Sequence, residues 1–137
     1  MLKKITQISL VLIMTVMVIS CKNAKQKLQE FVTSYNAAAP NFKAENVTLT
    51  TARGYINDDK IELRFETNLE QNAPNKLAAG IAFDKLLKEM IKKNQIPKDL
   101  VEEGIQFDAY FLADDNTVFV KQIINKETLP ELFNLFW

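Results

Sequence analysis

Two pairs of adjacent carboxylates, Asp58-Asp59 and Asp114-Asp115, are the residues of this chain whose type and spacing come nearest to a chemical site. Carboxylate oxygens are the ligands that Ca²⁺ prefers, and the ion takes about six to eight oxygens. Two carboxyl groups that face one another can also act as acid and base in glycoside hydrolysis. Neither pair has the spaced acids and closing glutamate of an EF-hand loop. Because Asp and Asn favour tight turns, we interpret both pairs as turn residues.

Other catalytic and metal-binding signatures are missing from the sequence. It contains no histidine and a single cysteine, which excludes serine–histidine and cysteine–histidine triads, histidine-ligated zinc and the HExxH protease motif. The GxSxG, P-loop and GxGxxG motifs are also absent. We therefore expect no catalytic residue, no metal and no cofactor, and predict that the protein is not an enzyme. A carboxylate-based hydrolase or metal-dependent enzyme is the alternative.

Composition places the chain among ordinary globular proteins. Its 137 residues are 47% hydrophobic and 25% charged, which suits one compact domain. The 17 Lys and Arg residues balance 17 Asp and Glu residues. Nucleic-acid-binding proteins usually carry a basic field, so we expect no nucleic-acid partner.

The N-terminal segment has the features of a secretion signal. Lys3 and Lys4 precede sixteen uncharged residues, 5–20, as in the n-region and h-region of a signal peptide. This run is shorter than the roughly 20 residues of a membrane-spanning helix. The sequence Val18-Ile19-Ser20-Cys21 resembles the lipobox of bacterial lipoproteins. The resemblance implies that residues 1–20 are removed and that Cys21 carries a lipid, whereas a plain membrane anchor is the alternative.

The residues after the cysteine indicate in which membrane the lipoprotein resides. Lys22-Asn23-Ala24-Lys25 contains neither the aspartate of inner-membrane retention signals nor the acidic cluster of surface-export signals. The resemblance therefore implies an outer-membrane lipoprotein that faces the periplasm, with the cell surface as the alternative. We divide the chain into a signal peptide (1–20), a lipidated tether (21–26) and one domain (27–137).

The mature chain consists of two units, each a helix followed by two strands. Apolar residues at steps of three and four predict a helix over 24–39, which ends at Pro40. Alternating β-branched residues from residue 45 predict a strand in which Gly54 marks a bulge or a twist. The alternation of residues 61–69 predicts a second strand with one face in water.

The second unit begins after Pro74, a residue that suits the first turn of a helix. An apolar stripe predicts this helix over 75–94, and a short helical turn follows after Pro97. Two strands, 105–113 and 117–124, are joined by Asp114-Asp115-Asn116, a strong hairpin signal. The residues from Thr128 to Glu131 match a capping box and open a short C-terminal helix.

Four strands joined mostly by hairpins predict a four-stranded antiparallel sheet. With helices on one face, the fold class is α+β and the architecture a two-layer sandwich. This pattern and the lipobox resemble the small single-domain envelope lipoproteins of Gram-negative bacteria of the Bacteroidota kind. The residues that carry the resemblance are Val18-Ile19-Ser20-Cys21, Tyr35 with Ala39-Pro40, Val47-Thr48-Leu49-Thr50-Thr51 and Gly104-Ile105. The family has no assigned activity, so the resemblance implies no catalytic residue.

Aromatic residues give the candidate binding site. Alternation puts Phe107, Phe111, Phe119 and Ile123 on one face of the second hairpin, and Tyr110, Leu112, Val118, Val120 and Ile124 on the other. Both faces are apolar, so either the helix 132–137 covers the second face or a ligand or partner does, and we favour the helix. Because Trp and Tyr dominate interface hot spots, the candidate partner-binding residues are Tyr110, Phe133, Phe136 and Trp137.

Charged residues form two further groups. Glu62, Arg64 and Glu66 follow the water-facing side of the second strand, with Lys121 beside them. We interpret them as solvated cross-strand pairs, and a contact surface for a charged partner is the alternative. The lysines of the second helix are interpreted as an exposed helix face, with lipid headgroup contact as the alternative; they are Lys85, Lys88, Lys92 and Lys93. Taken together, these features predict a membrane-anchored binding or accessory module for a protein partner or small ligand.

Overall fold

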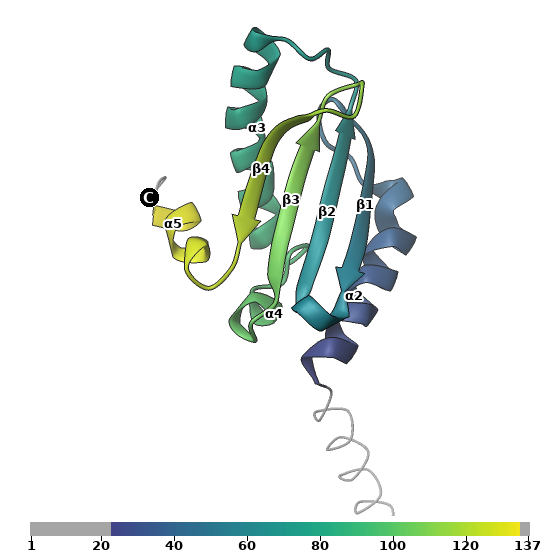
Figure 1. Cartoon of the computed structure of the whole chain (residues 1–137), viewed down its shortest axis with the longest axis vertical. Helices are drawn as coiled ribbons and strands as arrows, with labels where there is room; N and C mark the ends of the chain where they lie inside the picture. Colours follow the sequence, from purple (N-terminus) through teal and green to yellow (C-terminus); the bar gives the residue numbers. More distant parts are fainter. Residues whose placement is uncertain (1–22, 135–137) are drawn as a thin grey trace, which may run out of the picture.

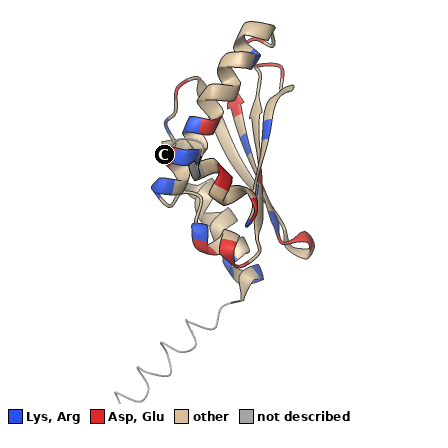
Figure 2. Ribbon diagram, turned by 90° about the vertical axis from the view of Figure 1, so that its left-hand side faces the viewer, with Lys and Arg blue, Asp and Glu red and all other residues tan. Residues whose placement is uncertain are grey.

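The computed structural model describes residues 23–134, with side chains described up to residue 132. Four strands form one sheet in the order β1-β2-β3-β4 (Figure 1). The strands are β1 (Val47–Tyr55), β2 (Lys60–Thr67), β3 (Gln106–Leu112) and β4 (Val118–Ile124). The helices are α2 (Ala24–Ala38), α3 (Ala73–Lys92), α4 (Lys98–Glu102) and α5 (Thr128–Asn134). Figure 2 shows the described helices on one side of the sheet, so the predicted two-layer α+β sandwich is confirmed.

The centre of the sheet differs from the prediction. The pairs β1–β2 and β3–β4 are antiparallel hairpins, as expected. The pair β2–β3 is parallel, so the prediction of an antiparallel sheet is wrong at this pair. The reason is the connection through α3. Its 20 residues span about 30 Å, which is enough to return the chain to the end of the sheet where β2 began.

Side-chain caps fix where the two long helices begin. The Asn23 side chain accepts a hydrogen bond from the backbone N–H of Gln26, and Asn72 accepts one from Asn75, each at 2.9 Å. Pro74 lies in the first turn of α3, as predicted, where its missing N–H has no intrahelical partner to lose. The first turn of α2 overlaps residues 24–26 of the predicted tether.

The core lies between the sheet and the helical layer. Strand β2 directs Ile61, Leu63 and Phe65 into it, and all three are fully buried. Phe83 of α3 stacks on Phe111 of β3 with ring centroids 5.0 Å apart and meets Phe65 edge-on at 5.6 Å. Such aromatic pairs contribute about 0.5–1.5 kcal/mol each beyond the area they bury. Because Ile61, Leu63 and Phe65 take the core side of β2, the residues that alternate with them lie on the face of the sheet away from the helices.

Gly54 serves a close approach between α2 and β1 and does not mark a bulge. A Cβ at this position would lie 2.7 Å from Leu28 Cδ2 and 3.3 Å from Val32 Cγ2. The irregularity of β1 lies instead between Val47 and Leu49. The glycine therefore lets the helix pack directly on the strand.

The register of the second hairpin corrects the predicted faces of β4. Phe107 pairs with Ile124 and Phe111 with Val120, while Tyr110 pairs with Lys121 and Asp108 with Ile123. Directly paired residues share a face, so Ile124 and Val120 join the core side and Ile123 does not. Counting along one strand could not fix the register between two strands, which also shifts at Phe111 and Leu112.

The short C-terminal helix is present, but its cap differs from the prediction. The side-chain oxygen of Asn125 accepts hydrogen bonds from the N–H groups of Glu127 and Thr128 at 3.0 Å each. The Thr128 hydroxyl donates to the carbonyl oxygen of Ile123 instead. Leu132 is buried in the core and Leu129 packs against it. The described part of α5 therefore extends the helical layer beside β4 and α3.

Candidate functional site

The sheet face opposite the helices is the candidate site, here called the open face. No helix of residues 23–134 covers it (Figure 2). On β2 it carries Lys60, Glu62, Arg64 and Glu66, which alternate with the buried residues of the same strand. The predicted water-facing side of this strand is confirmed.

Cross-strand pairing arranges the open face in rows. Arg64 pairs with Tyr110 of β3, and Tyr110 with Lys121 of β4. The next row joins Arg53 of β1 to Glu62 of β2. Lys121 is therefore two strands away from Arg64, with Tyr110 between them, and is not beside it as the predicted ladder assumed.

Two acidic groups of the open face, Glu62 and Asp108, contact neighbouring side chains, and Glu66 is half-buried. Asp108 is buried, accepts a hydrogen bond from Gln106 at 2.8 Å, and lies 3.6 Å from the ammonium nitrogen of Lys60. Glu62 is half-buried and accepts a hydrogen bond from the Tyr55 hydroxyl at 3.3 Å. These carboxylates are therefore already engaged within the sheet.

Three cations of the open face project into solvent: Arg53, Arg64 and Lys121 are all exposed. The Arg53 guanidinium lies over the Tyr55 ring at 5.4 Å, and the Lys121 ammonium lies over the Tyr110 ring at 5.3 Å. A hydrogen bond with Tyr110 raises the pKa of Lys121. The outer layer of the open face is thus cationic and aromatic.

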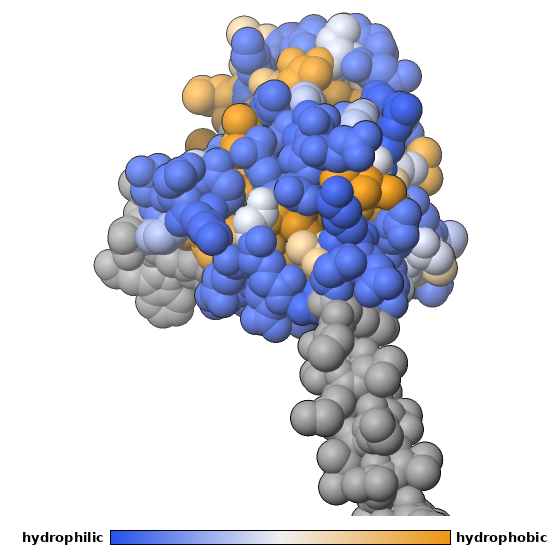
Figure 3. All heavy atoms as spheres, turned by 60° about the horizontal axis from the view of Figure 1, so that its bottom comes forward, coloured by the Kyte–Doolittle hydropathy of each residue, from blue (hydrophilic) through white to orange (hydrophobic). Residues whose placement is uncertain are grey.

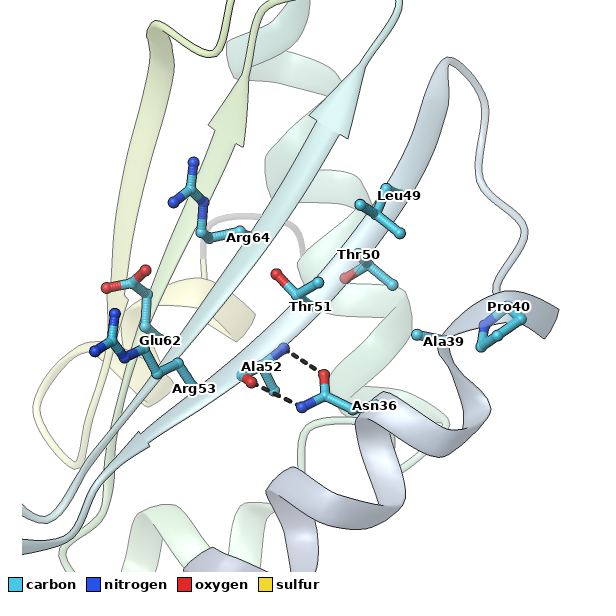
Figure 4. A pocket seen from close by; sticks show the side chains of 10 residues that line it. All are labelled: Asn36, Ala39, Pro40, Leu49, Thr50, Thr51, Ala52, Arg53, Glu62 and Arg64. Atoms are coloured by element: carbon cyan, nitrogen blue, oxygen red, sulfur yellow. Dashed lines mark hydrogen bonds between the residues drawn. The ribbon is translucent and has the colours of Figure 1, made fainter.

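A hollow of about 630 Å³ continues the open face around the edge of β1 (Figure 4). Leu49, Thr51 and Arg53 line it from the strand, and Ala39 and Pro40 from the 3-10 turn Ala39–Asn41 that follows α2. Figure 4 shows Arg53 and Arg64 directed to the open face.

The Asn36 side chain closes the edge of β1 within this hollow. Its Nδ2 donates to the Ala52 carbonyl at 2.9 Å, and its Oδ1 accepts from the Ala52 N–H at 2.8 Å. These are the bonds that a neighbouring strand would make with Ala52. The amide therefore takes the place of a fifth strand at this position.

The two carboxylate pairs do not converge. Asp58 and Asp59 form the turn between β1 and β2, and Asp59 adopts a left-handed conformation with φ of 48°. Asp114 and Asp115 lie in the β3–β4 turn, at the other end of the sheet (Figure 1). Hydrogen bonds from the Thr117 hydroxyl and N–H lower the pKa of Asp115. Both pairs therefore act as turn residues, as interpreted.

No group of three or more His, Cys, Asp or Glu side chains gathers as a metal site within residues 23–134. Over the same range, no helix has the length and apolar character to cross a membrane.

The predicted lysine group lies on α3 and at its C-cap, Lys93, and divides into two kinds. Lys85, Lys92 and Lys93 are exposed, as expected for a solvated helix face, and Lys93 forms an ion pair with Glu89 at 3.7 Å. Lys88 is 8% exposed, so its inclusion in an exposed lysine face is wrong. Burial lowers its pKa, as does the charge of Lys92.

Apolar residues reach the surface in separate places. Leu77 and Ile81 of α3 are 74% and 71% exposed, and Leu49 and Val118 lie on the two outer strands. The end of the molecule seen in Figure 3 is mainly hydrophilic with small apolar patches. The described surface therefore offers no single large apolar area there.

Of the predicted binding residues, Tyr110 lies on the open face, half-buried. Cys21, Phe136, Trp137 and the side chain of Phe133 lie outside the described residues. Arg53 and Tyr55 belong to the open face but were not predicted. Continuing the alternation of β1 through Gly54 to the end of the strand would have found them.

Comparison with solved structures finds two pilotins. The chain is similar to the type II secretion system pilotin AspS from Vibrio cholerae, with a TM-score of 0.39 and 14% identity over 75% of this chain and 95% of that chain. It is also similar to the pilotin EpsS of the Vibrio vulnificus type 2 secretion system, with a TM-score of 0.42 and 10% identity over 75% of this chain and 94% of that chain. No protein-family model and no curated protein sequence matches. At these TM-scores and identities the likeness carries no functional argument for this chain.

Proposed function

We propose that this protein is a membrane-anchored, non-enzymatic binding module that holds an acidic segment of a protein partner on its open face. The observation that carries the proposal is the distribution of charge on that face. Arg53, Arg64 and Lys121 project into solvent, whereas Glu62 and Asp108 are partly or fully buried. A partner therefore meets cations first, although the whole chain is electrically balanced.

The side chains suit recognition of carboxylates. A guanidinium presents two parallel N–H groups to a carboxylate, which gives orientation as well as attraction. Tyr55 and Tyr110 add flat, half-buried rings beside these cations, and tyrosine is a frequent hot-spot residue. The hollow at the edge of β1 gives the bound segment a place to continue beyond the sheet.

The proposed anchor determines how the open face is presented. A lipid on Cys21 would lie two residues before Asn23, the cap of α2. In Figure 1, α2 starts at the end of the sheet that holds the β1–β2 turn. The strands would then point away from the membrane and the open face would look sideways along it. We propose the periplasmic side of the outer membrane as the location, with the cell surface as the alternative.

Site-specific photocrosslinking in the native membrane tests the proposed interface. A photoreactive residue at Thr51, which is exposed on the open face, is compared with one at Lys76, which is exposed on α3. We expect a specific protein adduct from position 51 only. The adduct should disappear in a triple variant with Arg53→Glu, Arg64→Glu and Lys121→Glu.

A matched triple variant controls for net charge. Lys43→Glu, Lys76→Glu and Lys85→Glu change three exposed lysines by the same amount and should leave the adduct at position 51 intact. The purified partner should bind more weakly as salt rises, since exposed charges are screened. Equal loss of the adduct in both triple variants, or an adduct at Lys76 alone, would refute the open face as the interface.

The anchor and the C-terminal aromatics need separate tests. Cys21→Ser should move the protein out of the membrane fraction, and protease treatment of intact cells distinguishes periplasm from cell surface. Changing Phe133, Phe136 and Trp137 to Ala should reduce the adduct if these residues extend the interface near Tyr110. Circular dichroism must show that the variant is folded, and a folded variant with a full adduct removes them from the proposal.

A further inference from the structure

A second concave site lies on the helical side of the sheet, away from the open face. It is a groove of about 410 Å³ between the C-terminal half of α2, the turn after it and the turn after α3. Its size falls in the range of small-molecule sites, roughly 300–1,000 Å³. The apolar side chains that line it include Phe31, Ala38, Phe42 and Pro97.

Aromatic rings and one hydroxyl pair build the wall of the groove. Phe31 and Tyr35 have ring centroids 5.6 Å apart, and Phe42 rests on the core ring of Phe65 at 5.9 Å. The Tyr35 hydroxyl and the Thr50 hydroxyl share a hydrogen bond of 2.6 Å. Because only one of the two O–H groups donates to the other, the second can donate to a ligand oxygen.

The lining decides the chemical class of the ligand. It contains no Lys, Arg, Asp or Glu, and its polar members carry hydroxyls or amides. A charged ligand would lose its hydration here without gaining a counter-charge. Burial raises the pKa of Tyr35 to about 12, so its hydroxyl stays a neutral donor at physiological pH.

Hydrogen bonds on both sides hold the groove in shape. The Asn36 amide ties α2 to the backbone of β1. After α3, the N–H groups of Gln95 and Ile96 both donate to the carbonyl oxygen of Met90 at 2.8 and 3.2 Å. A ligand that binds to a preformed site loses little binding free energy to the ordering of the side chains around it.

We propose that this groove binds a neutral, largely hydrocarbon small molecule that carries one hydrogen-bond acceptor. The acceptor would lie at the Tyr35–Thr50 hydroxyl pair, and the apolar part against Phe31, Ala38 and Phe42. The groove opens on the helical side of the sheet and the open face lies on the other side; the groove shares only Ala39 and Thr50, at the edge of β1, with the hollow beside the open face.

Benzophenone is a suitable probe, since it is a neutral aromatic ketone that labels adjacent C–H bonds under ultraviolet light. The full chain is irradiated with rising benzophenone concentrations, both purified and in native membranes, and labelled residues are mapped by mass spectrometry. We expect saturable labelling of residues 31–42 and 94–97. Non-saturable labelling, or saturable labelling elsewhere, would overturn the proposal.

Two neighbouring alanines of α2 provide a matched pair of variants. Ala37 and Ala38 are both exposed, but only Ala38 lines the groove. Ala38→Trp should fill the groove and abolish labelling, whereas Ala37→Trp should keep it, with equal melting temperatures as the check on folding. Equal labelling of both variants would contradict the assignment.

Tyr35→Phe examines the polar end of the groove. This variant should bind benzophenone roughly 3- to 10-fold more weakly, the effect of losing one hydrogen bond. An unchanged affinity for benzophenone would show that the ligand needs no hydrogen-bond acceptor. A protein adduct from a photoreactive residue at Ala38, which is exposed and lines the groove, in native membranes would overturn the small-molecule assignment, because a protein segment would then occupy the groove.

Discussion

Replacing Asn36 with alanine measures how much the side-chain amide, which bonds the edge of β1 as a neighbouring strand would, contributes to the free energy of unfolding. Asn36→Ala removes both hydrogen bonds to Ala52, at 2.8 and 2.9 Å. Each net hydrogen bond contributes about 1 kcal/mol to folding. Alanine recovers about 0.5 kcal/mol because it favours helix more than asparagine does. The free energy of unfolding should therefore fall by about 1.5 kcal/mol.

Guanidinium denaturation is the appropriate assay. The midpoint should shift to lower denaturant while the slope m stays constant, because the surface exposed on unfolding is unchanged. The melting temperature should fall by roughly 6 °C for a domain of this size.

Thr33→Ala is the matched control for Asn36→Ala. Thr33 is exposed on the same helix, and the change brings a similar gain in helix propensity with no bond to β1 lost. A third variant, Asn36→Asp, keeps the acceptor but sets a carboxylate against the Ala52 carbonyl oxygen, so it should be less stable than Asn36→Ala at neutral pH. Equal stability of Asn36→Ala and Thr33→Ala would refute the reasoning.

Three further predictions concern packing and titration. Gly54→Ala should lower the free energy of unfolding, measured by chemical denaturation, by about 1–3 kcal/mol, because the added Cβ would lie 2.7 Å from Leu28 Cδ2. In a double variant with Leu28→Ala the two losses of stability should not add, and additive losses would contradict the contact. The pKa of Tyr35 is raised from 10.0 to about 12 in the folded chain. The neutral hydroxyl therefore stabilises the fold fully below pH 10, and this stabilisation is lost as pH rises through 12. The free energy of unfolding, measured at pH 9 and 12, should show the loss, and the Tyr35→Phe variant should lack it. Leu77→Ser with Ile81→Ser should change stability by less than about 0.5 kcal/mol each, since the side chains are 74% and 71% exposed; a large fall in melting temperature would show that these residues are packed.

Secondary structure was largely predictable because its signals are local. The alternation of β2 predicted one buried and one solvated face, since successive side chains of a strand point to opposite sides. Pro74 and the apolar stripe after it predicted α3. The turn residues Asp58-Asp59 and Asp114-Asp115 predicted both hairpins.

Features that depend on two segments at once were not predictable in the same way. Gly54 suggested a bulge or a twist from the sequence of its own strand, but a side chain there would meet Leu28, 26 residues earlier. The faces of β4 were misassigned because the register across a hairpin depends on the pairing, which shifts near Leu112. Lys88 was expected to be exposed, and only its surroundings in the folded chain bury it.

The candidate site shows the same division. Glu62, Arg64 and Glu66 were recognised as a solvated set from alternation alone. Their neighbours depend on strand order, and the parallel pairing of β2 with β3 put Tyr110 between Arg64 and Lys121.

The sequence by itself determined the element types, the α+β class and the water-facing side of β2, because propensity, capping and alternation act over a few residues. It also carries the lipobox resemblance on which the proposed anchor rests. Tertiary structure alone decided that β3 runs parallel to β2, that the open face projects cations above recessed acids, and that α2 and the turn after α3 enclose an apolar groove. Those features arise from contacts between distant segments, whose pairing is set by the packing of the whole core and is not encoded in any single element.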